Sequence, residues 1–71
     1  MSGRRRTVEE LTVRQREITL LVVQGLSNKE IARQLNIAED TVKIHLHQVY
    51  RQLGISNRTT LTAFAYGDRA D

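Results

Sequence analysis

Cysteine, proline and tryptophan are absent from the 71-residue chain, and aromatic residues make up only 4% of it. A chain without cysteine has no disulfide framework and no thiolate metal site, which fits a reducing compartment. So few aromatic rings cannot readily build the stacking surfaces on which proteins bind single-stranded DNA or RNA. If the chain binds a nucleic acid, duplex DNA is therefore the better candidate.

Long apolar runs are also missing. None approaches the roughly 20 residues that cross a bilayer, and no apolar segment follows Arg4–Arg6 as it would in a secretion signal. We therefore expect no membrane contact and a cytoplasmic location. The length allows one small domain, which would bury only about 60% of its unfolded surface. A formal net charge of +3 mildly favours a polyanionic partner such as nucleic acid.

Helix-capping residues divide the chain into segments. Thr12 with Gln15, and Ser27 with Glu30, match the capping box that starts a helix, and Asn57 is a suitable N-cap for a last helix. Three helix ends are marked by a residue that tolerates a left-handed backbone and is followed by an apolar residue: Gly25-Leu26, Asn36-Ile37 and Gly54-Ile55. These signals predict helices near 13–24, 28–35, 39–53 and 58–66.

The expected fold class is all-α, a four-helix bundle, because no sustained period-two alternation supports a strand. A short helix, a tight turn and a longer helix form a helix-turn-helix pattern over about 27–46. Residues 1–10 lack apolar periodicity and are expected to be a flexible lead-in to a domain over 11–67, with a frayed end at 68–71. Three of the helices offer a clear apolar stripe for the core: Ile18, Leu21, Val22, Ile31, Ala32, Leu35, Val42, Leu46, Val49 and Leu53.

The side of helix 39–53 opposite its core stripe combines basic and polar residues with one branched hydrocarbon. Ile44 projects near the centre of this side, with Lys43, His47, Gln48 and Arg51 around it. The major groove of DNA offers matching partners, since phosphates and guanine accept from Lys or Arg and the thymine methyl takes an apolar contact. A single exposed isoleucine on a solvated face is equally ordinary, so periodicity alone leaves both interpretations open.

Four stretches of the sequence resemble one known family. They are LTVRQRE (11–17), GLSNKEIA (25–32), TVKIHL (41–46) and LGISNR (53–58), in the family's order and spacing. Across residues 11–65 the chain resembles the LuxR/FixJ-type (GerE-like) DNA-binding domain of bacterial transcription regulators. The resemblance implies a four-helix domain that binds double-stranded DNA, with helix 39–53 in the major groove and helix 58–66 at a dimer contact.

The resemblance also implies residue roles. Lys43, Ile44 and His47 match base-contacting positions, and Lys29 and Thr41 match backbone-contacting positions, although Lys29 could be solvated and Thr41 could serve the helix start. Three further residues are expected at the DNA backbone: His45, Arg51 and Arg58. For Arg51 and Arg58 a solvated or ion-paired role is as good an interpretation, and His45 could instead pack toward the first helix.

Helix 58–66 has an apolar side made of Leu61, Phe64 and Ala65. This side could complete the core or form the dimer interface that the resemblance implies. We expect a weak homodimer whose DNA half-sites lie roughly 10 bp apart. RNA polymerase or an upstream regulatory domain is a further candidate partner.

No metal, cofactor or catalytic activity is expected. His45 and His47 are two residues apart and point to nearly opposite sides of a helix, whereas helical ligand pairs are spaced three or four apart. Glu17 and Glu30 have no partner motif for acid–base chemistry and are expected to pair with a base or to close a cap. The alternative function is a protein–protein interaction module with little DNA affinity.

Ala38 and the first two residues of helix 39–53 depart from the family's usual pattern. Many members of the family that the chain resembles have a serine at position 38, where its side chain caps the helix. Ala38 cannot form this cap, and the missing cap should cost about 1 kcal/mol of helix stability. Glu39 and Asp40 favour the positive end of the helix dipole but repel phosphate.

Overall fold

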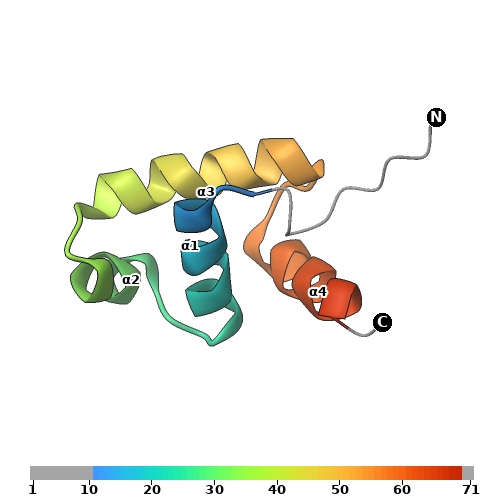
Figure 1. Cartoon of the computed structure of the whole chain (residues 1–71), viewed down its shortest axis with the longest axis horizontal. Helices are drawn as coiled ribbons and strands as arrows, with labels where there is room; N and C mark the ends of the chain where they lie inside the picture. Colours follow the sequence, from blue (N-terminus) through green and yellow to red (C-terminus); the bar gives the residue numbers. More distant parts are fainter. Residues whose placement is uncertain (1–10, 70–71) are drawn as a thin grey trace.

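The computed structural model describes the backbone of residues 11–69 and the side chains of residues 11–66. Its elements are four helices, α1 (Val13–Val23), α2 (Asn28–Leu35), α3 (Glu39–Leu53) and α4 (Arg58–Arg69), with no strand among the described residues (Figure 1). The expected all-α fold class is confirmed. The expected lead-in over 1–10 lies outside the described residues.

The predicted helix bounds agree closely with the observed ones. The predictions for α2 and α3 match residue for residue, and α1 ends one residue earlier than expected. Helix α4 continues through Gly67 to Arg69, although the sequence predicted its end at residue 66 and fraying from residue 68. Gly67 therefore lies within the helix and does not end it.

The N-terminal caps form as the sequence predicted. The Thr12 hydroxyl accepts from the Gln15 backbone amide at 3.1 Å, and the Gln15 side chain accepts from the Thr12 amide at 3.0 Å. Ser27 and Glu30 form the same reciprocal pair at 3.1 and 2.8 Å. Asn57 Oδ1 accepts from the Thr60 amide at 2.8 Å and so caps α4. These bonds satisfy backbone donors that have no partner inside the helix.

The first three helices all end in the same way. Gly25, Asn36 and Gly54 have positive φ angles of 97°, 59° and 73°, which is the left-handed conformation expected after a helix. The next residue in each case donates its backbone amide five residues back, at 3.1, 3.0 and 2.9 Å. These next residues, Leu26, Ile37 and Ile55, also pack against the core. Each stop therefore both closes a helix and buries an apolar side chain.

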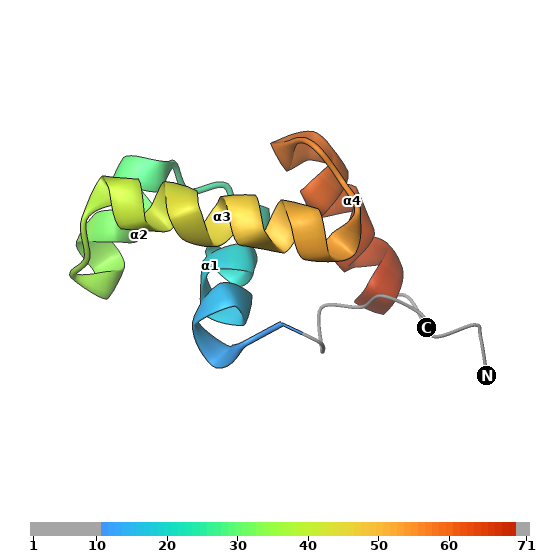
Figure 2. The same cartoon turned by 90° about the horizontal axis from the view of Figure 1, so that it is seen from above.

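Helix α3 lies across the other three helices. In Figures 1 and 2, α1 lies beneath the middle of α3, with α2 near its first turns and α4 near its end. Helix α1 contacts each of the other helices. Seen from above, no described helix covers the outer side of α3 (Figure 2). The fold thus leaves one long helix half uncovered.

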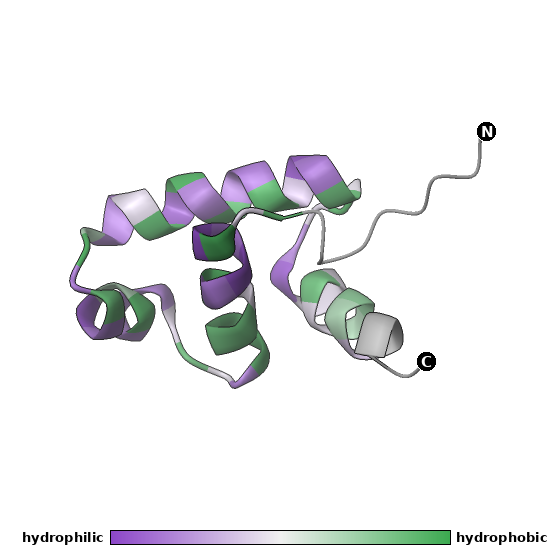
Figure 3. Cartoon of the chain, viewed as in Figure 1, coloured by the Kyte–Doolittle hydropathy of each residue, from purple (hydrophilic) through white to green (hydrophobic). Residues whose placement is uncertain are grey.

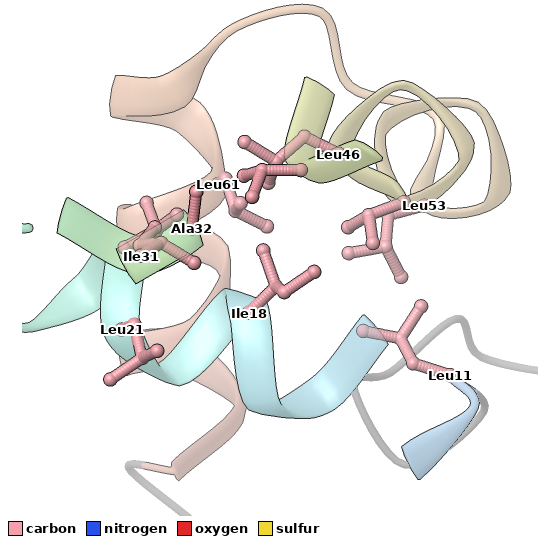
Figure 4. Close-up of a cluster of buried hydrophobic side chains, with 11 residues drawn as sticks. Leu11, Ile18, Leu21, Ile31, Ala32, Leu46, Leu53 and Leu61 are labelled. Atoms are coloured by element: carbon pink, nitrogen blue, oxygen red, sulfur yellow. The ribbon is translucent and has the colours of Figure 1, made fainter. Parts of the chain in front are cut away.

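The core lies where the four helices meet. It contains all but one of the predicted stripe residues, with Leu35 only partly buried. Figure 4 shows how side chains from the different helices converge, among them Ile18, Ile31, Leu46 and Leu61. Hydrophobic and hydrophilic bands alternate along α3 in Figure 3, as an amphipathic helix requires.

Candidate nucleic-acid interface

The uncovered side of α3 carries the residues that the sequence placed opposite the core. Val42, Leu46, Val49 and Leu53 are buried, which turns the other side of the helix outward. All five residues of the opposite side are exposed: Lys43, Ile44, His47, Gln48 and Arg51. Ile44 keeps 58% of its surface exposed and does not belong to the core cluster. Ile44 and the hydrogen-bond donors near it on α3 therefore all face outward, as the periodicity of the helix predicted.

The start of α3 differs from the starts of α1 and α2. Ala38 has the extended backbone of an N-cap, with φ −72° and ψ 149°, but supplies no side-chain acceptor. Glu39 and Asp40 occupy the first turn and are exposed, where their charge stabilises the positive end of the helix. The first turn of α3 is thus acidic, and the basic residues follow it.

One border of this face is formed with α2 and α4. Asn28, Lys43, His47, Tyr50 and Arg58 line a shallow hollow there, together with Leu46. The Arg58 guanidinium donates to Asn28 Oδ1 at 2.7 Å and to the backbone carbonyl of Leu26. Arg58 was expected at the DNA backbone, but the structure shows it tying α4 to the α1–α2 turn.

The other border is formed with α1. Gln15 Nε2 donates to Gln48 Oε1 at 3.3 Å, a contact that the sequence did not suggest. Thr41 and His45 are half-buried along this border. The Nδ1 atom of His45 is buried and has no hydrogen-bond partner in the described part of the chain. His45 therefore packs partly inward, which was one of its two expected roles.

The first turn of α2 carries an exposed cation. Lys29 is exposed at the second position of the helix. Glu30 points back to the cap, and bonds from the Ser27 amide and hydroxyl lower its pKa, with a smaller contribution from Arg33. Glu17, the other acid expected to be structural, lies 3.6 Å from Arg14. These acids serve caps and ion pairs, as predicted.

The expected dimer residues are mostly in the core. Leu61 is fully buried and Ala65 is 4% exposed, while Phe64 is only partly buried. Of the two roles that the sequence left open, Leu61 and Ala65 take the core role, because both lie on the side of α4 that packs against the rest of the domain. Among the described side chains of α4, the exposed ones are Thr59, Thr60, Ala63 and Tyr66.

Two negative observations hold for the described residues. Within residues 11–69, no three His, Cys, Asp or Glu side chains lie together in a way that could hold a metal ion. In the same part of the chain, no helix has the length and apolar character needed to cross a membrane.

Comparison with known proteins identifies related sequences. Residues 9–65 match the family model described as bacterial regulatory proteins, luxR family. The chain is 39% identical over 64 residues to the nitrate/nitrite response regulator protein NarL of Escherichia coli, which covers 90% of this chain and 30% of NarL. It is 47% identical over 53 residues to the monoamine regulon transcriptional regulator of Klebsiella aerogenes, covering 75% of this chain and 23% of that protein.

A third relative is the CsgBAC operon transcriptional regulatory protein of Escherichia coli, 44% identical over 55 residues, with 78% of this chain and 26% of that protein covered. The chain thus spans less than a third of the length of the relatives it matches. The shared region contains the helix-turn-helix and the uncovered face of α3.

Proposed function

Since the chain belongs to the luxR family of bacterial regulatory proteins, we propose that it binds double-stranded DNA sequence-specifically, with α3 in the major groove. The observation that carries this proposal is the uncovered face of α3. Helix α3 is long enough to lie in the groove, because its 15 residues span roughly 22 Å. The major groove is about 12 Å wide and accepts a helix.

The N-terminal half of α3 holds the proposed base contacts. Recognition helices in this class read base edges with their first turns, where Lys43, Ile44 and His47 are exposed. Lys43 suits guanine O6 and N7, and Ile44 suits a thymine methyl. His47 can donate to a base or phosphate. In this arrangement the exposed Ile44 side chain gains an apolar partner.

The proposed backbone contacts flank this group. Lys29 at the start of α2 and Arg51 one turn beyond His47 are both exposed and cationic. Thr41 and His45 are half-buried, so only part of each side chain can reach a phosphate. Arg58 already donates to Asn28 and Leu26. Its contribution to a phosphate is therefore secondary to its role in holding the turn.

We further propose that two copies associate weakly through the outward side of α4. The available surface is Thr59, Ala63 and Tyr66, of which Tyr66 is 55% exposed, with the accessible part of Phe64 beside them. Small residues next to one aromatic side chain allow close approach of two helices. A second copy would place a second α3 on the DNA, and half-sites roughly 10 bp apart would follow.

The test uses duplexes selected by the protein from a randomised library. Log affinity should fall linearly with log salt, with a slope of about −0.9 for each phosphate neutralised. Lys43→Ala should weaken binding and relax the preference at one base position. Equal binding of wild type and Lys43→Ala across the library would refute the role of Lys43.

A protein–protein interaction module is the second candidate, and specific observations favour it. Leu20 is 48% exposed and Ile44 is 58% exposed, so apolar docking residues are available. Glu39 and Asp40 repel phosphate at the start of α3. Apolar docking would be nearly independent of salt. A chain that selects no duplex but retains a salt-insensitive protein partner would overturn the DNA proposal.

A further inference from the structure

A continuous series of hydrogen bonds runs from the start of α1 to the uncovered face of α3. The Thr12 backbone amide donates to Gln15 Oε1 at 3.0 Å. Gln15 Nε2 in turn donates to Gln48 Oε1 at 3.3 Å. Gln15 is buried, at 7% exposure, whereas Gln48 is exposed. The series therefore begins at a helix cap, crosses the interior and ends at the surface.

The direction of this series is set by its first member. A backbone amide can only donate, so the oxygen of the Gln15 carboxamide must face Thr12 and its nitrogen must face Gln48. That nitrogen can only donate too, so the oxygen of Gln48 must face Gln15. Gln48 Nε2 is left without a hydrogen-bond partner among the described residues. The cap of α1 thus determines which end of the Gln48 amide points away from Gln15.

We propose that Gln48 is a DNA contact that acts only as a hydrogen-bond donor, that its partner is a backbone phosphate, and that Gln15 is the residue that positions it. This inference rests on the proposed function and adds a contact and a mechanism to it. Glutamine recognises adenine by accepting from N6 and donating to N7 at once. The Gln48 oxygen already accepts from Gln15 Nε2, so a two-bond contact with adenine would have to share that oxygen with Gln15. A phosphate needs only the Nε2 donor.

The place of Gln48 on α3 agrees with a phosphate partner. Its bond with Gln15 places it at the border of the uncovered face with α1, whereas Ile44 projects near the centre of that face. A neutral amide also differs from the lysines and arginines nearby in one measurable way. It strengthens binding without adding a positive charge, so it should not change the number of counterions released.

The first test replaces Gln48 with Met, which keeps the length and helical preference of the side chain but removes its hydrogen bonds. Gln48→Met should weaken binding to library-selected duplexes roughly tenfold, as expected for a bond to a charged group. The loss should be uniform over all selected sequences, and the salt slope should stay unchanged. Arg51→Ala is the matched control, because it removes a proposed cationic phosphate contact and should lower the slope by about one. A changed preference at one base position would overturn the phosphate assignment.

The second test reverses the amide while keeping the cap. In Gln15→Glu one carboxylate oxygen still accepts from Thr12, but the other now faces Gln48, whose nitrogen must turn inward to donate to it. The variant should remain folded, as measured by circular dichroism, and should bind DNA several-fold more weakly. The new carboxylate could also repel the DNA phosphates directly. The same substitution in a Gln48→Met background measures this repulsion alone, because the Gln48 amide is then absent.

The double-mutant comparison decides the outcome. Gln15→Glu should cost clearly less affinity in the Gln48→Met background than in wild type. An equal cost in both backgrounds would show that Gln15 does not act through Gln48. A DNA-free measurement separates this failure from failure of the DNA proposal: the Gln15 side-chain amide protons should exchange slowly, and faster in Gln48→Met. Unchanged exchange would overturn the series of bonds whatever the chain binds.

Discussion

Replacing Ala38 with Ser should stabilise the domain by completing the one helix start that lacks a side-chain cap. The backbone at Ala38, with φ −72° and ψ 149°, closely matches that of Thr12 (−65°, 166°) and Ser27 (−77°, 166°). A serine hydroxyl at this position can therefore reach the third-residue amide of the helix without a backbone change. Ala38 is exposed, so the new hydroxyl costs no core packing.

The magnitude follows from the existing caps. At Thr12 and Ser27 the hydroxyl accepts an amide at 3.1 Å, and such a cap contributes about 1 kcal/mol. The corresponding donor in α3 is the Thr41 amide, which now lies 3.0 Å from the Ala38 carbonyl oxygen. The reciprocal half of a capping box is missing, because Thr41 replaces a Glu or Gln. We therefore expect about 1 kcal/mol and not more.

The assay is thermal and urea unfolding followed by circular dichroism. For a domain of this size, 1 kcal/mol raises the Tm by about 4–8 °C, and the urea midpoint should rise with an unchanged m-value. Ser27→Ala is the matched control and should lose a similar amount. If Ala38→Ser leaves stability unchanged while Ser27→Ala lowers it, the reasoning that α3 lacks a cap is refuted.

Two further substitutions test the Glu30 cap and the core. The pKa of the Glu30 carboxyl is lowered by the Ser27 amide and hydroxyl, and to a smaller extent by Arg33. The ionised carboxylate therefore stabilises the fold at pH values above the ordinary pKa of 4.5. This stabilisation is lost as the pH falls below that value. Glu30→Gln should therefore flatten the fall in unfolding free energy between about pH 5 and 3; identical profiles would contradict this. Leu61→Ala should cost about 2–5 kcal/mol in chemical unfolding, because the side chain is fully buried, and a loss below 1 kcal/mol would contradict its place in the core.

The helix bounds could be predicted because their signals are local. Ser27 and Glu30 lie three residues apart and form their cap from those positions alone. Gly54 ends α3 because a left-handed backbone is easily adopted by glycine. The periodic apolar residues of α3 likewise identify its buried side without knowledge of the partner helices. The uncovered face follows from that side by elimination.

Contacts between distant residues could not be predicted in this way. Arg58 and Leu26 are 32 positions apart, and Gln15 and Gln48 are 33 positions apart. No periodic or capping signal links such pairs, since each depends on how whole helices are placed. Leu61 illustrates the same limit, because an apolar stripe fits a core and a dimer interface equally well. Only the position of α1 decides between them.

The acidic residues at the start of α3 stabilise this end of the helix and lie at the edge of the proposed interface. Ala38 leaves the first amides of the helix without a side-chain acceptor, and Glu39 and Asp40 supply negative charge to the same end. A hydroxyl cap would stabilise that end without charge, whereas two carboxylates do so while repelling phosphate. The repulsion is screened over about 8–10 Å at physiological salt, so it acts on the nearest phosphates and hardly on those near Arg51. The same pair of residues therefore favours the fold and, in the proposed complex, would disfavour non-specific binding. The proposed base contacts by Lys43 and Ile44 would then supply a larger share of the affinity.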